Sequence, residues 1–253
     1  MARHDGVVTI TLDRPAKKNA INGTMWDELL ATLREISLAP TTDRVVVLTG
    51  ANGEFCSGAD LTASEGGAAR HQYHAMKHVG DVALALHKLP QPTIAKVRGV
   101  AVGAGCNMAL GCDLVVAGET ARFSQIFARR GLSLDFGGSW LLPRLVGMQR
   151  AKELAFFADI IGAAEAERIG LVNRVLPDSE LDAFVDDWAR RLASGPPIAL
   201  AMSKRLLNNS LNVTMEEALD DEGLSQTVNF GTKDTVEAMM AFVEKRPPNF
   251  RGA

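Results

Sequence analysis

Two short segments rich in small residues have the composition of turns that bring backbone N–H groups close to a ligand. The first, FCSGADL at 55–61, follows the apolar run RVVVLT at 44–49. The second, GVAVGAGCN at 99–107, follows the apolar run TIAKV at 93–97. Small residues let the backbone approach a ligand, and a glycine-rich turn that enters a helix points free N–H groups at it. Two such N–H groups from separate turns would hold one carbonyl oxygen.

Each segment taken alone also fits simple close packing of a strand against a helix. The stretch from Gly99 to Gly105 lacks the Gly-Lys-Ser/Thr ending of a phosphate-binding loop. It also lacks a suitable third glycine for a dinucleotide-binding fingerprint. The ligand-binding and packing interpretations therefore both stay open at this point, and nucleotide binding is disfavoured.

A carboxylate and three histidines are the next candidates for chemistry. Asp135 precedes Gly137, Gly138 and a helix expected from about Ser139, so by position alone it suits a helix-capping aspartate. The histidines at 71, 74 and 78 have a spacing that places them on one face of a helix. No cysteine or carboxylate pattern accompanies these histidines, so no metal site is predicted. Glu65, Asp81 and Cys56 are weaker candidates for assisting roles.

Strands alternate with helices along the first part of the chain, which predicts an α/β fold. Strands are expected at 7–12, 44–49, 93–97 and 113–117, and a helix at 21–38 with Asn22 as its cap. Gly195-Pro196-Pro197 then breaks the chain, and 198–243 has the pattern of helices only. We therefore expect one region at 1–195 and a helical region at 196–253.

The overall composition excludes several classes of protein. With 47% hydrophobic residues, 23% charged residues and a net charge of −3, neither disorder nor nucleic-acid binding is expected. Three cysteines, at 56, 106 and 112, argue against a disulfide framework and for a reducing compartment. There is no signal-peptide core and no apolar run of ~18 residues. These features predict a cytoplasmic protein that does not bind a membrane.

Four segments resemble the enoyl-CoA hydratase/isomerase (crotonase) superfamily. They are DRPAKKNAI at 13–21, FCSGADL at 55–61, GVAVGAGCNMALGCDLVVA at 99–117 and the tail FVEKRPPNF at 242–250. The resemblance implies a spiral core of repeated ββα units at 1–195. It also implies that 196–253 is a helical region that assembles a homotrimer, or a dimer of trimers.

The resemblance further implies that the chain binds an acyl-CoA thioester. The family's oxyanion hole uses two backbone N–H groups, which fall on Ala59 and on Ala104, where the family usually has glycine. Coenzyme A is expected near Lys17 and along Ala59, Asp60 and Leu61. Phe242 and Lys245 match positions that contact CoA from a neighbouring subunit. No separate cofactor and no metal are expected, because CoA is part of the substrate.

The acid/base positions depart from the pattern of the family's hydratases, which use two glutamates. Their positions are occupied here by Asn107 and Phe127, which cannot act as a general acid or base but are still expected at the substrate. Asp135 stands where hydratases usually have glycine. The stretch around it is similar to phenylacetate-pathway isomerases, in which this aspartate is the proton shuttle. Burial would raise its pKa and make it a better base.

The sequence therefore predicts an isomerase that converts a 3-enoyl-CoA to the 2-trans-enoyl-CoA with Asp135 as the shuttle. Three alternatives stay open. The first is a 2-enoyl-CoA hydratase of fatty-acid oxidation. The second is aryl-CoA dehalogenase or hydrolase chemistry, with Asp135 as nucleophile and His71 or His74 as base. The third is an acyl-CoA binder without turnover.

Overall fold

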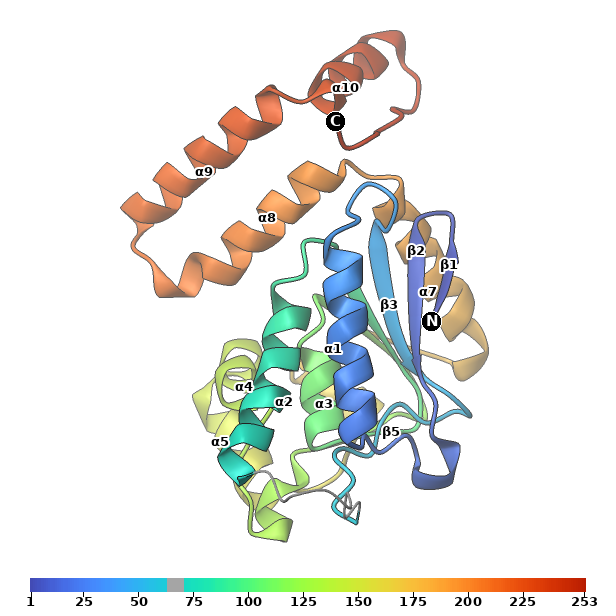
Figure 1. Cartoon of the computed structure of the whole chain (residues 1–253), viewed down its shortest axis with the longest axis vertical. Helices are drawn as coiled ribbons and strands as arrows, with labels where there is room; N and C mark the ends of the chain where they lie inside the picture. Colours follow the sequence, from blue (N-terminus) through green and yellow to red (C-terminus); the bar gives the residue numbers. More distant parts are fainter. Residues whose placement is uncertain (63–70) are drawn as a thin grey trace.

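A six-stranded sheet between two layers of helices forms most of the computed structural model, which describes residues 1–62 and 71–253 (Figure 1). All neighbouring strands pair in parallel except β1, which pairs antiparallel with β2. The strands lie in the spatial order β1 (Ala2–His4), β2 (Val7–Leu12), β3 (Val45–Gly50), β4 (Thr93–Val97), β6 (Leu114–Gly118) and β9 (Arg174–Leu176).

The apolar run of β3 shows why the two faces of this sheet are covered. Val45 and Val47 pack in one cluster with α7 (Asp178–Ala193), and Val46 and Leu48 pack in the other cluster, on the opposite face. Side chains alternate along a strand, so a strand that is buried on both faces reads as a continuous hydrophobic run. The strands expected from the sequence at 7–12, 44–49, 93–97 and 113–117 are confirmed to within one residue.

The second face is covered by helices that lie side by side in Figure 1. The helix α1 (Gly23–Ser37) begins after Asn22, whose side chain accepts a hydrogen bond from the backbone N–H of Met25, as the sequence predicts. Its buried face packs against α2 (Gln72–His87). The other helices of this part of the chain are α3 (Ala104–Leu110), α4 (Gly138–Val146), α5 (Met148–Phe157) and α6 (Ala163–Arg168).

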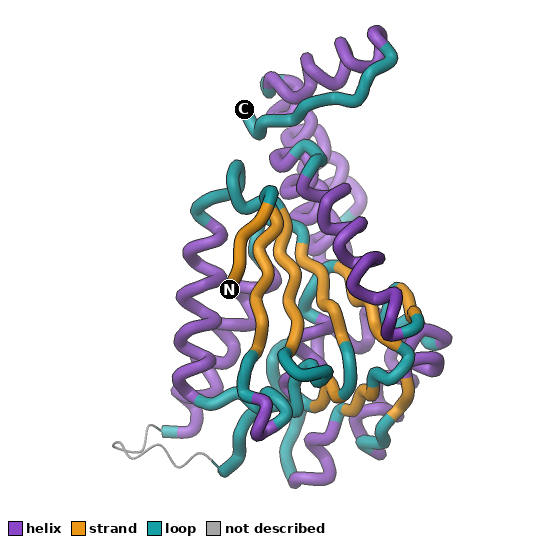
Figure 2. Tube along the Cα trace, turned by 90° about the vertical axis from the view of Figure 1, so that its right-hand side faces the viewer, coloured by secondary structure: helices purple, strands orange, loops and turns teal. Residues whose placement is uncertain are grey.

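A smaller sheet, which the sequence did not predict, lies at one end of the large one (Figure 2). It consists of β5 (Val100–Val102), β7 (Arg122–Ser124) and β8 (Ile161–Gly162). Two short 3-10 helices, η1 (Pro15–Lys17) and η2 (Ile126–Arg130), flank the same end. These elements are too short for a periodic pattern, so their pairing depends on contacts between distant parts of the chain.

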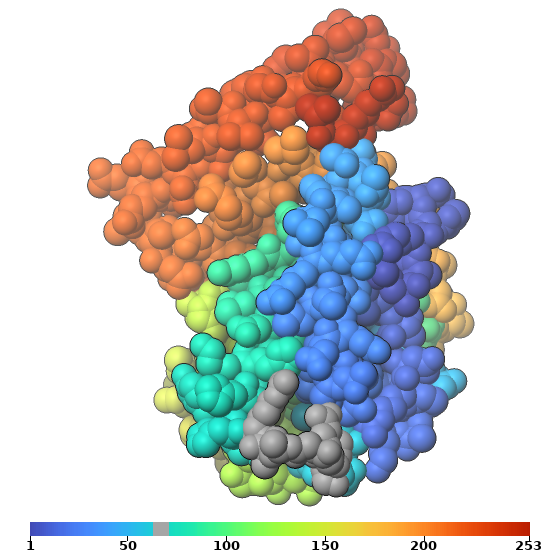
Figure 3. All heavy atoms as spheres, viewed as in Figure 1, coloured from blue at the N-terminus to red at the C-terminus, as the bar shows by residue number. Residues whose placement is uncertain are grey.

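The last part of the chain is helical and projects from one end of the body of the molecule (Figure 3). It consists of α8 (Pro197–Asn209), η3 (Ser210–Asn212), α9 (Met215–Phe230) and α10 (Lys233–Glu244), as predicted for 198–243. Within α9, Ser225 is the one buried residue. Large apolar side chains of this part are exposed: Leu207, Leu211, Met215, Leu219, Leu224, Val228, Phe230, Val236, Met239, Met240, Phe242 and Val243. The boundary near residue 195 stays a prediction.

Among the residues at 1–62 and 71–253, no helix has both the length and the apolar character needed to cross a membrane.

Candidate active site

The two small-residue segments lie side by side and are joined through their main chains. The N–H of Cys56 donates to the carbonyl of Val100 (2.8 Å), and the N–H of Val102 donates to the carbonyl of Cys56 (2.9 Å). A Cβ atom on Gly105 would lie 2.4 Å from the carbonyl oxygen of Cys56, so only glycine fits there. The packing interpretation of the second segment is therefore right for Gly105, and this packing also fixes the turn that follows β5.

The first turn leaves the backbone N–H of Ala59 available. Ile21 forms a parallel bridge with Ala59, in which the N–H of Ile21 donates to Gly58 and the N–H of Asp60 donates to Ile21, each at 2.8 Å. In a parallel bridge the central residue has its own N–H on the opposite side. Among the described residues, that N–H has no acceptor.

The second turn likewise leaves a backbone N–H available, that of Ala104, the first residue of α3. The first N–H groups of a helix have no partner within it, and the N–H of Ala104 has no acceptor in the described part of the chain. Gly103, just before it, has a φ of +57°, which favours glycine. A Cβ on Gly58 would lie 3.7 Å from the nitrogen of Ala104, so the two turns meet at this point.

A cavity of about 410 Å³ opens over these turns. Seven of the predicted site residues line it, namely Lys17, Ala59, Asp60, Leu61, Ala104, Phe127 and Asp135. Asn107, Phe242 and Lys245 do not. The other lining residues, which the sequence analysis did not single out, are Ala20, Ser57, Gly58, Thr62, Val102, Gly103, Ile126, Arg130 and Leu132. Several of them belong to the motifs at 55–61 and 99–107, so these motifs could have identified them from the sequence.

The carboxyl group of Asp135 faces this cavity without a hydrogen-bond partner. Its Oδ1 atom is buried and has no partner among the described residues. Burial raises the pKa of Asp135 to about 6, because a low-dielectric environment disfavours the charged form. At neutral pH the group is therefore ionised but retains substantial affinity for a proton.

The helix-capping interpretation of Asp135 is wrong. The cap of α4 is Gly137, and no side chain accepts a hydrogen bond from the first turn of the helix. The N–H of Gly138 donates instead to the main-chain carbonyl of Asp135, at 2.8 Å. Phe136 and Gly137 have φ values of +46° and +77°. This sharp turn presents the carbonyl of Asp135 to the helix and leaves the carboxyl free.

Phe127 and Asn107 occupy the positions where the sequence analysis placed the two glutamates of the family's hydratases. Of the two, Phe127 lines the cavity and Asn107 does not. Phe127 is buried and lines the cavity, where it can exclude water. Asn107 is fully buried behind it, and its Nδ2 donates to the carbonyl of Asp135 at 2.9 Å. Its Oδ1 accepts from Nε2 of Gln125 at 2.8 Å. Gln125 was missed by the sequence analysis, because nothing in the segment Phe123-Ser124-Gln125-Ile126 indicates a contact with Asn107.

Asp60 is held in an ionic network at the edge of the cavity. Its carboxylate accepts hydrogen bonds from the backbone N–H and the hydroxyl of Thr62 and pairs with Arg14. These bonds, first those from Thr62, hold the pKa of Asp60 well below its usual range. Lys17 lies beside this network, with its Nζ 3.4 Å from the hydroxyl of Thr62. Asp60 therefore stays ionised and fixes the turn.

Phe242 and Lys245 lie far from the cavity within one chain. They lie at the C-terminal end of α10, which Figure 1 shows at the top of the molecule, away from α3 in the body below. The side chain of Phe242 is 86% exposed. The sequence analysis expected both residues to act from a neighbouring subunit, and a single chain does not bring them to the site.

The histidines have separate surroundings. His71 lies just before α2 rather than within it and caps the helix by accepting a hydrogen bond from the N–H of Tyr73. His78 lies 2.8 Å from the carboxylate of Asp27 on α1. In the described ranges, 1–62 and 71–253, no group of three or more potential metal ligands lies together. None of the histidines lines the cavity over the two turns.

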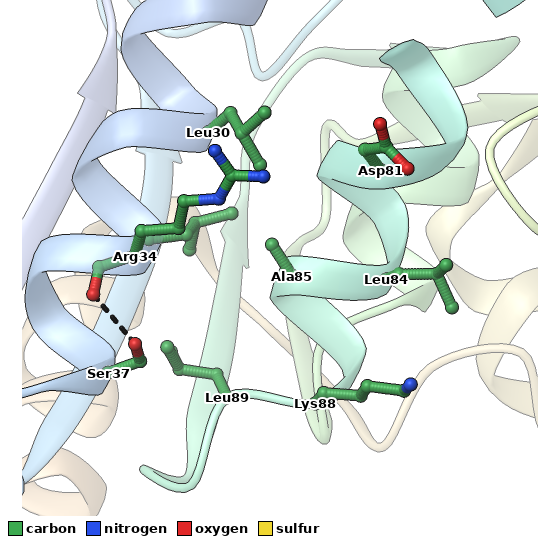
Figure 4. A pocket seen from close by; sticks show the side chains of 9 residues that line it. Leu30, Arg34, Ser37, Asp81, Leu84, Ala85, Lys88 and Leu89 are labelled. Carbon is green, nitrogen blue, oxygen red and sulfur yellow. Dashed lines mark hydrogen bonds between the residues drawn. The ribbon is translucent and has the colours of Figure 1, made fainter. Parts of the chain in front are cut away.

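The weaker candidates are also separated from that cavity. Asp81 lines a different cavity of about 350 Å³ between α1 and α2, together with Arg34 and Lys88 (Figure 4). Cys56 is buried, and burial raises the pKa of its thiol to about 12, so it is not a base at neutral pH. Glu65 lies outside the described residues.

The cavity over the two turns thus combines groups that suit one kind of chemistry. Two backbone N–H groups without acceptors are the kind of donor that can stabilise negative charge on an oxygen atom placed between them. A carboxylate with a pKa of about 6 accepts and returns a proton near neutral pH. The apolar side chains of Leu61, Phe127 and Leu132 border the same space.

The family model, the related sequences and the solved structures that match this chain all point to one family. The family model described as Enoyl-CoA hydratase/isomerase matches residues 2–253. A probable enoyl-CoA hydratase of Rhodobacter capsulatus is 41% identical, over 98% of this chain and 95% of that protein. The 1,2-epoxyphenylacetyl-CoA isomerase of Escherichia coli is 36% identical, over 98% and 95%. A crystal structure of an enoyl-CoA hydratase from Bacillus anthracis matches with a TM-score of 0.93 and 34% identity, over 98% of this chain and 96% of that one.

Proposed function

Because the chain belongs to the enoyl-CoA hydratase/isomerase family and has its fold, we propose that it moves a double bond in an acyl-CoA thioester. The proposed reaction converts a 3-enoyl-CoA to the 2-trans-enoyl-CoA. The observation that carries the proposal is the carboxyl of Asp135, which lines the cavity, has a buried oxygen without a partner and has a pKa of about 6. Asp60, the other carboxyl among the described lining residues, already accepts hydrogen bonds from Arg14 and Thr62.

The two backbone N–H groups support the first half of this reaction. Removal of a proton from C2 delocalises negative charge over a dienolate and onto the thioester oxygen. The N–H groups of Ala59 and Ala104 are proposed to donate to that oxygen. By analogy with known oxyanion holes, each such donor lowers the barrier by roughly 3–4 kcal/mol.

Asp135 is proposed to serve both halves of the reaction. Its carboxylate takes the proton from C2, and the resulting acid returns a proton to C4 of the dienolate. The double bond then lies between C2 and C3, and water is neither added nor removed. One group is sufficient when C2 and C4 present the same face to it. A pKa close to the working pH suits a group that must both accept and donate.

Hydration of a 2-enoyl-CoA is the second candidate, because the R. capsulatus relative is named as a probable hydratase. Hydration needs one group to activate water and another to deliver the proton. Phe127 has no titratable group, and the amide of Asn107 is engaged with Gln125 and with the carbonyl of Asp135. These observations support the isomerase over the hydratase.

The proposal includes assembly into a homotrimer. The exposed apolar side chains of α8–α10 support this, since such surfaces are usually covered by a partner. In the trimer, Phe242 and Lys245 of one subunit are proposed to contact the CoA of its neighbour. No cofactor is required besides the CoA that is part of the substrate.

The experiment compares wild-type protein with Asp135→Asn. We expect the variant to lose isomerisation of a 3-enoyl-CoA, and exchange of the C2 proton in heavy water, by roughly 10²–10⁴-fold. Asp81→Asn is the matched control and should retain both activities, because Asp81 lines the other cavity. Full activity of Asp135→Asn would disprove the role of this residue.

Three further measurements separate the alternatives. Substantial conversion of crotonyl-CoA to the 3-hydroxyacyl-CoA would identify a hydratase. A covalent acyl or aryl adduct on Asp135 would identify nucleophilic chemistry. Binding of CoA esters without C2 exchange in the wild-type protein would identify a binder without turnover.

A further inference from the structure

Two buried amide side chains connect the interior of the protein to the main chain of Asp135. Gln125, between β7 and η2, donates from Nε2 to Oδ1 of Asn107 at 2.8 Å. Asn107, on α3, donates from Nδ2 to the carbonyl of Asp135 at 2.9 Å. Asn107 and Gln125 are 0% and 2% exposed. Burying two polar side chains is costly unless they are hydrogen-bonded, so this chain of bonds requires an explanation.

The surroundings of Asn107 are shaped so that its amide can reach Asp135. A Cβ atom on Gly138 would lie 2.3 Å from Nδ2 of Asn107, and a side chain there would displace the amide. The carbonyl of Asp135 accepts from both Asn107 and the N–H of Gly138. Both lone pairs of this oxygen are therefore used, which fixes the orientation of the peptide group after Asp135.

The turn that carries Asp135 needs such support. Phe136 has a φ of +46°, a conformation that costs an ordinary residue of order 1 kcal/mol or more. The ring of Phe136 is buried and stacks on Trp26 of α1, with the ring centres 5.7 Å apart. The ring of Phe136 and the amide of Asn107 therefore both hold the turn that follows Asp135.

We propose that Asn107 and Gln125 are positioning residues that fix the main chain of Asp135 and so hold its carboxyl at the cavity. This inference rests on the proposed role of Asp135 as proton shuttle. The two residues act through Asp135 and do not line the cavity themselves. Asn107 must be an amide for this purpose, because it has to accept from Gln125 and donate to Asp135, which a carboxylate cannot do.

The neutrality of the pair is the second part of its function. Among the described residues, the charged groups that line the cavity with Asp135 are Lys17, Asp60 and Arg130, and Asp60 is paired with Arg14 outside the lining. Burial is the cause of the raised pKa of Asp135. A carboxylate at position 107 would add a buried negative charge behind Asp135 and would raise its pKa further.

The test is Asn107→Asp, which keeps the shape of the side chain and removes its donor when the new carboxyl is ionised. We expect kcat for 3-enoyl-CoA isomerisation to fall by roughly 10–100-fold with KM little changed, since a small misplacement of a catalytic group has effects of this size. The acid limb of the pH profile for C2 exchange should move to higher pH. A merely structural role would lower stability without lowering kcat at pH values at which Asp135 is ionised, and this outcome would overturn the inference.

Asn208→Asp is the matched control. Its Nδ2 also donates to a main-chain carbonyl, that of His87, but away from the cavity. It should leave kcat and the pH profile unchanged. If Asn107→Asp does not fold, Gln125→Leu removes the donor that holds Asn107 without adding a charge. We expect it to lower kcat several-fold with KM unchanged, and wild-type kcat would overturn the inference.

Parallel measurement of Asp135→Asn separates this inference from the proposed function. If Asp135→Asn retains activity, the proposed function fails and the inference fails with it. If Asp135→Asn is inactive while folded Asn107→Asp and Gln125→Leu have the wild-type kcat and pH profile, only the positioning role is disproved.

Discussion

The two halves of the candidate site are held in place by different kinds of contact. The turns at 55–61 and 99–107 are joined by main-chain hydrogen bonds and by the close approach of Gly105 to Cys56. The loop with Asp135 is held by side chains, namely the amide of Asn107 and the ring of Phe136. The first half presents N–H groups, and the second presents a carboxyl.

Because of this difference, we expect side-chain substitutions to change the half with the N–H groups little and the half with the carboxyl more. Main-chain hydrogen bonds do not depend on which side chains the turns carry, provided that the glycines are retained. A loop held by side chains changes when those side chains change. Such a division is consistent with relatives of similar overall identity being named as a hydratase in one case and an isomerase in another.

Gly105→Ala should have the largest effect, because it breaks the main-chain half. The new Cβ would lie 2.4 Å from the carbonyl of Cys56, an atom that cannot move without disrupting the bridge to β5. We expect the free energy of unfolding to fall by about 3 kcal/mol, the upper end for overpacked cores. Urea denaturation followed by circular dichroism measures this.

Gly80→Ala on α2 is the control for this substitution. Nothing lies within 4 Å of the Cβ that it would add. Alanine in an open helical position should raise the free energy of unfolding by up to about 1 kcal/mol. Equal destabilisation by the two substitutions would contradict the account of the first half.

Asp135→Asn should have the next largest effect, and in the opposite direction. Burial of the carboxyl raises its pKa from 3.8 to about 6, so at pH 7 the folded protein holds a charge that the unfolded chain solvates better. Removing this charge should raise the free energy of unfolding at pH 7 by roughly 2 kcal/mol, with about 3 kcal/mol as the upper limit.

The pH dependence of this gain follows from the sign of the shift. Between pH 4 and about 6 the folded state of the wild type binds more protons than the unfolded state, so its stability falls as the pH rises. The difference between variant and wild type should therefore be near zero at pH 4 and reach its full size above about pH 7. A gain that is independent of pH would show that the carboxyl is not the cause.

Lys17→Ala should have the smallest effect and tests the binding edge of the site. The ammonium group of Lys17 is exposed beside Thr62, at the edge of the cavity. If Lys17 contacts CoA, as the family resemblance implies, its loss removes an interaction that is equal in the ground and transition states. KM should then rise by roughly 2–10-fold with kcat unchanged. Steady-state kinetics that show a lower kcat would instead place Lys17 in the chemical step.

Much of the fold could be predicted because its long elements carry a clear pattern. The helix at 21–38 has apolar residues at helical spacing and a capping asparagine, and the structure has α1 at 23–37 with Asn22 as its cap. The continuous apolar run at 44–49 predicted a strand, and the structure has β3 there, buried on both faces. The pairing of β5 with β7 could not be predicted, because each has only three residues.

The site was predictable to the extent that it follows motifs. Ala59 and Ala104 were expected from the two small-residue segments and the family resemblance, and both line the cavity. The role of Gln125 could not be predicted, since its contact with Asn107 joins positions 18 residues apart. The capping role considered for Asp135 was wrong because sequence position does not reveal the left-handed turn at Phe136.

The burial of the cysteines has a consequence for how the protein withstands oxidants. Cys56 lies three residues before Ala59, and Cys106 lies two residues after Ala104, so each turn carries a sulfur atom. Burial raises the pKa of both thiols to about 12, so both thiols stay protonated at pH 7. Peroxides attack the thiolate and need access to it. While the chain is folded, burial therefore makes the two thiols beside the site slow to react with peroxides.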